Sequence, residues 1–219
     1  MAITLWGRLN SVNVQKVVWA LEELGLAYAS VPLGGKYGGL AEPAYRAMNP
    51  NSRVPTLRDG DLVVWESHAI VRYLAGAYGS GSLWPADPRE RAEADQWTDW
   101  TATTFQSAWL AVFEAIVRTP EPKRDAALIA RAEAAANRLY AMLDQRLAAR
   151  DFLGGDRPSY ADIVTGASMF RWTTMPHERP DMPNLAAWHR RLEARPAFVK
   201  AVCVDFSDMY GAALPLPPQ

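Results

Sequence analysis

The sequence predicts a two-domain chain, in which an α/β unit is followed by an all-helical unit. Strand-like and helix-like segments alternate over residues 1–79, whereas the strand signals vanish after Pro88. A Gly-, Ser- and Pro-rich stretch, YGSGSLWPADP, separates the two units and is the best candidate for a linker. The chain has 219 residues, of which 49% are hydrophobic and 21% charged, a composition that suits one or two globular domains.

Hydrophobic periodicity and turn residues define the elements of the first unit. Short runs with β character predict strands at 3–6, 27–33, 55–58 and 62–65. Apolar residues at helical spacing predict helices at 14–24, 42–50 and 67–77. Gly25 ends the first helix, and Asp59-Gly60 is a dipeptide that favours a tight hairpin turn between the last two strands.

The second unit has helical patterns throughout. Residues 89–117 predict one long helix or two abutting helices, and an apolar stripe from Leu128 to Leu147 predicts another. Three shorter helices are expected near residues 160–175, 184–194 and 196–204. The second unit is therefore expected to be an all-α domain over residues 88–219.

Charge and cysteine content exclude several classes of function. The net charge is −1 and the pI is near 6.3, which argues against binding nucleic acid or an anionic membrane. Cys203 is the single cysteine, so an internal disulfide framework, a CxxC redox pair and a cysteine-rich zinc site are excluded, and no metal is expected. We expect Cys203 to be a small packed hydrophobe.

The start of the sequence predicts a cytoplasmic location. Arg8 and Asn10 interrupt the first apolar residues before they could form the hydrophobic region of a signal peptide. In the rest of the chain, no apolar run approaches the roughly 20 residues that would span a bilayer. Small molecules or other proteins are therefore the expected partners.

Three short motifs occur in register with this pattern: Val54-Pro55 before a strand, ESHAI (66–70) at a helix start, and SYADI (159–163). Together with the order of strands and helices, they resemble the cytosolic glutathione transferase family, in particular its bacterial serine-type, theta-like or nu-like members. The resemblance implies a thioredoxin-like, glutathione-binding domain over residues 1–79. It also implies an all-α domain over residues 88–219 that shapes the pocket for a second substrate.

The resemblance implies how glutathione would be held along its backbone. Pro55 would be cis, leaving the backbone N–H and C=O of Val54 free to pair with the cysteinyl unit of the tripeptide as a short antiparallel strand. The alternative is a trans proline that merely protects an edge strand, and the residues alone favour it.

The two ends of glutathione would meet side chains. By resemblance Ser67 receives the γ-glutamyl carboxylate at a helix start, and Glu66 accepts from the γ-glutamyl ammonium. The alternative for Ser67 is to serve as the N-cap of its own helix. The loop that often holds the glycyl carboxylate lacks the usual Gln or His, so Lys36 or Arg53 is expected to bind it.

The segment NSVNVQK stands where a thioredoxin would have its redox cysteines, so the thiol must come from the ligand. A thiol has a pKa near 8.5, and lowering it by about two units requires about 2.7 kcal/mol of preferential thiolate stabilisation. A hydroxyl or amide N–H near a helix N-terminus can supply that amount. Ser11 is the first candidate, and Asn13 is the second, because Ser-x-Asn with Lys16 beyond it resembles nu-like and fungal members. Ordinary helix capping is the alternative for both residues.

Aromatic residues in the second unit are candidates for the wall of the second-substrate pocket. Apolar electrophiles suit such walls, but tryptophans at helical spacing more often belong to a core. The candidates are Trp97, Trp100, Thr104 and Trp109. SYADI is structural on either interpretation, because Ser159 is expected to cap a helix and Asp162 to reach back to the cap.

The leading hypothesis is a glutathione transferase of a detoxification type, which conjugates the glutathione thiolate to a small hydrophobic electrophile. Two alternatives stay open: a glutathione-dependent disulfide-bond reductase, which the resemblance of Asn13 supports, and a non-catalytic glutathione-binding protein. The isomerase branch of the family is less favoured, because NSVNVQK does not match its motif. By resemblance we also expect a homodimer.

Overall fold

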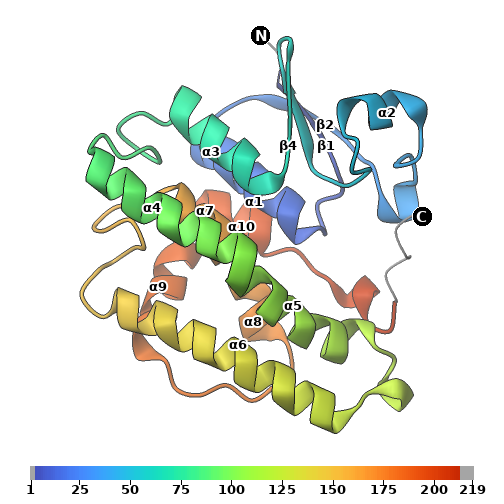
Figure 1. Ribbon diagram of the computed structural model, residues 1–219, viewed down its shortest axis with the longest axis vertical. Helices are drawn as coiled ribbons and strands as arrows, with labels where there is room; N and C mark the ends of the chain where they lie inside the picture. The colour runs from blue at the N-terminus through green and yellow to red at the C-terminus, as the bar shows by residue number, and fades with distance from the viewer. Residues whose placement is uncertain (1–2, 213–219) are drawn as a thin grey trace.

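The computed structural model describes residues 3–212, and its first domain is built on a four-stranded mixed sheet (Figure 1). The strands are β1 (Ile3–Trp6), β2 (Tyr28–Val31), β3 (Thr56–Asp59) and β4 (Leu62–Trp65). Their order across the sheet is β2-β1-β3-β4, with β1 parallel to β2 and antiparallel to β3. Leu5 faces Leu57 in the central pair, and both side chains are buried. The predicted thioredoxin-like domain is therefore observed.

Two details of the β-hairpin differ from the expectation. The strand begins at Thr56 rather than Pro55, because proline has no N–H to donate to the ladder. Asp59 is the last residue of β3, paired with Leu62 of β4, so the two turn residues are Gly60 and Asp61. Gly60 has a φ of 58°, which fits a primed hairpin turn that needs left-handed backbone.

Helices surround the sheet and connect its strands. They are α1 (Val12–Glu23), the 3₁₀ turn η1 (Gly35–Tyr37), α2 (Pro43–Met48) and α3 (Ser67–Tyr78). Both α1 and α3 bury one apolar face, on which Val17, Leu21, Ile70 and Leu74 are inaccessible to solvent. Burial of side chains of this size is the main stabilising contribution to such a domain.

The second domain, from α4 onwards, is helical. Its elements are α4 (Pro88–Trp100), η2 (Thr101–Phe105), α5 (Gln106–Phe113), η3 (Glu114–Arg118), η4 (Glu121–Lys123), α6 (Ala126–Leu147), α7 (Tyr160–Gly166), α8 (Met169–Thr174), α9 (Pro183–Glu193), α10 (Pro196–Val202) and η5 (Ser207–Met209). The segment predicted as one or two helices at 89–117 is one continuous helical stretch with π-helical turns at η2 and η3.

The two domains share one hydrophobic core, and α1 is the element that joins them. Trp19 of α1 is fully buried and meets Phe198 of α10 edge to face, with ring centroids 4.9 Å apart. Gly166 of α7 allows the close approach, since a Cβ there would lie 3.1 Å from the Trp19 ring. At the surface of this contact, Arg195 and Lys200 form ion pairs with Glu23 and Glu22. The first domain is thus fixed to the second through α1.

Among residues 3–212, the helices are all too short or too polar to cross a lipid bilayer.

Candidate active site

The Val54–Pro55 peptide bond is cis, as the resemblance implied. Val54 is half-buried between α2 and β3, and its N–H and C=O have no hydrogen-bond partner among residues 3–212. Its neighbour Arg53 is fixed instead, because the Arg53 carbonyl accepts from the Tyr45 hydroxyl and from Asn49 Nδ2 at 2.8 Å. The backbone of Val54 is therefore available to pair with an extended ligand, in the manner of an added strand.

Ser11 is the residue that precedes α1, and its hydroxyl is not used by the helix. Its backbone is extended, at φ −93° and ψ 122°, and its carbonyl accepts from the N–H of Gln15 at 2.9 Å. The side chain makes no capping hydrogen bond. The capping alternative for Ser11 is therefore wrong for the side chain, and a half-buried hydroxyl is left beside the N-terminus of α1.

Ser67 is the first residue of α3, and the idea that it caps its own helix is wrong. Glu66 occupies the N-cap position with a φ of 71°, and neither side chain bonds the free N–H groups of the first turn. Ser67 is only 6% exposed, and its hydroxyl instead lies 3.4 Å from Asn13 Oδ1, to which it donates. The N-termini of α1 and α3 therefore meet, and two helix dipoles point at the same region.

Lys16 is buried one turn into α1 and organises the polar groups around it. Its Nζ donates to Asn13 Oδ1 at 3.1 Å, to His68 Nε2 at 2.8 Å and to Gln106 Oε1. Three acceptors match the three N–H groups of an ammonium. Because Asn13 turns its carbonyl oxygen to Lys16, its NH₂ group is left to donate elsewhere, and no partner for it occurs among residues 3–212.

The electrostatics of this cluster follow from its burial. Desolvation lowers the pKa of Lys16 to about 7, and the Glu66 carboxylate opposes part of that shift. Desolvation, followed by the charge of Lys16, lowers the pKa of His68 to about 2. His68 is therefore a neutral imidazole, which donates from Nδ1 to the Thr98 carbonyl at 3.2 Å and accepts from Lys16 at Nε2.

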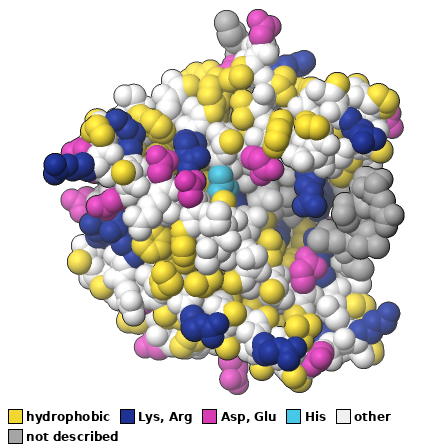
Figure 2. All heavy atoms as spheres, in the orientation of Figure 1, with side chains coloured by type: hydrophobic (Ala, Val, Ile, Leu, Met, Phe, Trp, Pro, Cys, Tyr) yellow, Lys and Arg dark blue, Asp and Glu magenta, His cyan; other side chains and the backbone are white. Residues whose placement is uncertain are grey.

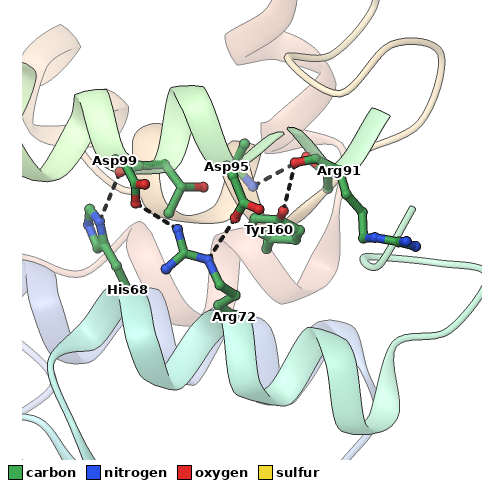
Figure 3. A network of polar contacts seen from close by, with 9 residues as sticks. His68, Arg72, Arg91, Asp95, Asp99 and Tyr160 are labelled. Carbon is green, nitrogen blue, oxygen red and sulfur yellow. Dashed lines mark hydrogen bonds and ion pairs between the residues drawn. The ribbon is translucent and has the colours of Figure 1, made fainter. Parts of the chain in front are cut away.

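His68 connects the two domains, because it contacts Lys16 of α1 and the Thr98 carbonyl of α4. Figure 3 shows His68 and Arg72 reaching from α3 towards α4, where Arg72 pairs with Asp95 at 2.8 Å and with Asp99 at 2.7 Å. Gln106, at the start of α5, completes the link to Lys16. The polar groups beneath the first turn of α1 are therefore supplied by both domains.

Sequence reasoning gave no role to His68 or Gln106 and mentioned Lys16 only as part of a motif. The contacts span 52 and 90 residues of sequence, so no local spacing reveals them. The one available signal was the position of Lys16 on the apolar face of α1, between Val12 and Val17, where a charged residue requires buried partners.

The residues expected to bind the glycyl carboxylate lie at the surface. Lys36 is exposed in η1, with its Nζ 5.4 Å from the centroid of the Tyr37 ring. The side chain of Arg53 is also exposed and makes no hydrogen bond or ion pair within residues 3–212. Both can reach a ligand in solution, and their role stays a prediction.

The four residues expected to line the second-substrate pocket are placed differently from one another. Trp109 is 1% exposed in the core and leaves no surface for a ligand. The Trp100 ring stacks on the Phe105 ring with their centroids 5.1 Å apart, and Trp97 packs edge to face against Trp100. Thr104 is exposed. The three tryptophans thus pack against other side chains, as the packing alternative has it. A contact of Trp97, Trp100 or Thr104 with substrate stays a prediction.

The SYADI motif forms the capping box that the sequence predicts. Ser159 Oγ accepts from the N–H of Ala161 at 3.2 Å, and Asp162 Oδ2 accepts from the N–H of Ser159 at 2.8 Å. Asp162 also accepts from Leu153 N–H and from Trp188 Nε1, so α7 is tied to the preceding loop and to α9. Full burial raises the pKa of Asp162, and these donors oppose the shift.

The described residues are arranged neither for a reactive cysteine thiol nor for a metal site. Cys203 is half-buried against the core, and desolvation raises the pKa of its thiol to about 11, which suits the packing role expected for it. Within residues 3–212, no three His, Cys, Asp or Glu side chains are grouped closely enough to hold a metal ion.

Comparison with known proteins agrees with this geometry. Residues 1–76 match the glutathione S-transferase N-terminal domain, and residues 101–196 match the C-terminal domain. The chain is 41% identical to Glutathione S-transferase GstB of Escherichia coli K12, over 94% of this chain and 100% of that protein. It is 33% identical to Glutathione S-transferase 3 of Zea mays, over 99% of this chain and 96% of that protein.

A solved structure is similar over nearly the same span. The theta class glutathione S-transferase of Xanthomonas axonopodis pv. citri, with glutathione bound, has a TM-score of 0.89 and 50% sequence identity. The match covers 93% of this chain and 98% of that chain. The chain therefore belongs to the glutathione S-transferase family of enzymes.

Proposed function

We propose that this protein binds glutathione between Val54 and the N-terminus of α3 and conjugates its thiolate to a small electrophile. The observation that supports it best is the meeting of two helix N-termini at Ser11, Asn13 and Ser67, where the Ser11 hydroxyl, the Asn13 NH₂ group and the first N–H groups of α3 are left without side-chain partners among residues 3–212. The relative from Xanthomonas axonopodis pv. citri was solved with glutathione bound, which supports the choice of ligand.

The tripeptide would be held by groups along its length. The backbone of Val54 would pair with the cysteinyl unit, and Ser67 with the N–H groups of α3 would receive the γ-glutamyl carboxylate. Glu66 would accept from the γ-glutamyl ammonium, and Lys36 or Arg53 would bind the glycyl carboxylate. These contacts would direct the thiol towards the first turn of α1.

Thiol activation would come from donors near that turn. Ser11 Oγ and the NH₂ group of Asn13 would each donate to sulfur, and the dipole of α1 would add to the preference for the thiolate. The thiol proton would go to solvent. The thiolate would then attack an electrophilic carbon, forming the S–C bond as the leaving group departs with its electron pair.

Steady-state assays test the class of reaction. Purified protein would be assayed against aryl halides, peroxides and mixed disulfides, each with and without glutathione. Turnover of an aryl halide only with glutathione supports conjugation, whereas preferential turnover of mixed disulfides supports the reductase alternative. Glutathione binding without turnover of any of the three would favour the non-catalytic alternative.

Ultraviolet titration of thiolate absorbance in the glutathione complex then separates the two candidate donors. We expect Ser11→Ala to raise the pKa of the bound thiol by about one to two units, because a charge-assisted hydrogen bond is lost. A shift found mainly in Asn13→Ala would assign activation to Asn13 and support the nu-like reductase alternative. If both variants fold, bind glutathione and show no shift, neither side chain activates the thiol.

We further propose that the protein is a cytoplasmic homodimer with a detoxification role, as its resemblance to cytosolic members of the family implies. A two-fold interface is the commonest arrangement of soluble oligomers. Sedimentation velocity at micromolar concentration tests the dimer, and a species of 24.3 kDa would contradict it.

A further inference from the structure

Three arginines gather where the helical domain meets the loop after β1. Arg8 belongs to that loop, Arg118 ends η3, and Arg171 lies on α8. Arg171 and Arg118 both lie against Phe113, with their Cζ atoms 5.0 and 5.7 Å from its ring centroid. We refer to Arg8, Arg118 and Arg171 as the arginine cluster.

Arg171 is the buried member of the cluster, with 3% of its surface exposed. Its guanidinium lies between the rings of Phe113 and Phe206, and its Nη2 donates to the Asn10 carbonyl at 2.6 Å. Its Nε is also buried and has no hydrogen-bond partner among residues 3–212. Such an unpaired buried donor on a charged group is rare in native proteins and requires an explanation.

The charges around the cluster do not balance. Among residues 3–212, Glu114 pairs with Arg118 at 3.1 Å and Asp208 is the other carboxylate near the cluster, so in this part of the chain three guanidinium groups face two carboxylates. Burial, together with the charges of Arg118 and Arg8, lowers the pKa of Arg171 to about 9, and the Asp208 carboxylate opposes part of that shift. A buried cation without a counter-ion is costly, and an additional anion would remove that cost.

We propose that the arginine cluster binds the carboxylate, or another compact anionic group, of the second substrate. This inference rests on the proposed conjugation and specifies its substrate class. Arg171 is bonded to Asn10, the residue before Ser11, so an anion held there lies beside the predicted thiol. Phe113 and Phe206 are only 1% and 4% exposed, so they hold the Arg171 guanidinium in place, and the half-buried Arg8 and Arg118 are the members of the cluster that a ligand can reach.

The position of the cluster favours the second substrate over glutathione as the source of the anion. Arg118 and Arg171 belong to the helical domain, whereas the groups proposed to hold glutathione lie in the first domain. Figure 2 shows a hollow between the upper and lower halves of the molecule, with Lys or Arg side chains in dark blue at its right-hand side. Arg8 also approaches the loop of Lys36, since a Cβ on Gly35 would lie 2.8 Å from Arg8 Nε. Binding of the glycyl carboxylate is therefore the alternative outcome of the test.

A pair of aryl chlorides that differ only in charge provides the test. In chloronitrobenzoate and the matching chloronitrobenzamide, the glutathione thiolate forms an S–C bond to the ring, the C–Cl bond breaks, and chloride leaves with the electron pair. We expect Arg8→Gln and Arg118→Gln each to lower kcat/KM for the benzoate by about tenfold, because one charge-assisted hydrogen bond is lost. The value for the benzamide should stay unchanged.

Arg131→Gln is the matched control, because it removes the same charge from an exposed site on α6. It should leave both values unchanged. Equal losses for the benzoate and the benzamide would overturn the proposal. A rise in KM for glutathione, with the ratio of the two aryl chlorides unchanged, would assign the cluster to the glycyl carboxylate and would also overturn it.

A binding measurement keeps the anion site testable without turnover. Titration calorimetry of benzoate into the glutathione-loaded protein should show binding that benzamide lacks and that Arg8→Gln weakens about tenfold. If neither aryl chloride reacts but benzoate binds in this way, conjugation fails while the anion site stands. If the aryl chlorides react and benzoate does not bind, the anion site fails while conjugation stands.

Discussion

Replacement of Lys16 by methionine should raise the pKa of the thiol of bound glutathione without loss of the fold. Lys16 donates to Asn13, His68 and Gln106, and its bond to Asn13 Oδ1 is what turns the NH₂ group of Asn13 away from Lys16. Methionine is similar in length and apolar, so it fills the space of the lysine stem but supplies neither the charge nor the donors. The proposed hydrogen bond from Asn13 to the thiolate then loses its fixed direction.

The size of the effect follows from that hydrogen bond. A charge-assisted hydrogen bond contributes about 1.5 to 3 kcal/mol, and one pKa unit corresponds to about 1.36 kcal/mol, so the thiol pKa should rise by about one to two units. Loss of the buried positive charge acts in the same direction. Near neutral pH, kcat/KM should fall about tenfold or more, and the loss should shrink as the pH rises above the new thiol pKa.

Ultraviolet titration of the glutathione complex and a pH profile of kcat/KM measure these two quantities. Lys16→Gln keeps a donor but no charge, so its thiol pKa should lie between those of wild type and Lys16→Met. Lys123→Met removes a lysine from the exposed turn η4 and serves as the control. A folded Lys16→Met protein that binds glutathione with the wild-type thiol pKa would refute the role of Lys16.

Three further outcomes are expected. Because the pKa of Lys16 falls to about 7 in the folded protein, the unfolded state binds more protons than the folded state between about pH 7 and 10.4. The free energy of unfolding, measured by urea denaturation, should therefore rise with pH in this range in wild type and rise less in Lys16→Met. Ser67→Ala should weaken glutathione binding, measured by titration calorimetry, by about 1.5 to 3 kcal/mol. It should barely change the free energy of unfolding, because Ser67 makes no capping bond. Unchanged affinity for glutathione would contradict the role of Ser67. Ser159→Ala should lower the free energy of unfolding by about 1 kcal/mol with unchanged KM for glutathione, and equal stability would argue against the capping box as a stabilising feature.

The sequence was informative where local chemistry decides the structure. Periodicity located α1, α3 and α6, and the serine and aspartate of SYADI are close enough in sequence to define their own capping box. The resemblance supplied what local rules could not, since cis bonds are a small minority of X–Pro bonds and Val54-Pro55 alone favours trans.

Prediction failed where two helix ends are brought together by the fold. Ser67 follows a strand and precedes a helix, a pattern typical of an N-cap, but Glu66 takes that position in a left-handed conformation that non-glycine residues seldom adopt. The partners of Lys16 and the arginine cluster come from distant segments, so only their tertiary arrangement shows that the charges are buried together. A pattern read along the chain contains no information about such pairings.

The burial of α1 in both domains restricts how ligands can enter. The N-terminus of α1, at Ser11 and Asn13, faces the proposed site, while Trp19 further along the same helix packs against Phe198 of the second domain. A rigid helix transmits any displacement of one end to the other, so the domains cannot swing apart about a hinge without disrupting the donors at Ser11 and Asn13. We therefore expect substrate entry and product release to depend on side chains and loops at the rim of the site. Domain motion should not limit the rate of turnover, so this motion should contribute no dependence of kcat on solvent viscosity.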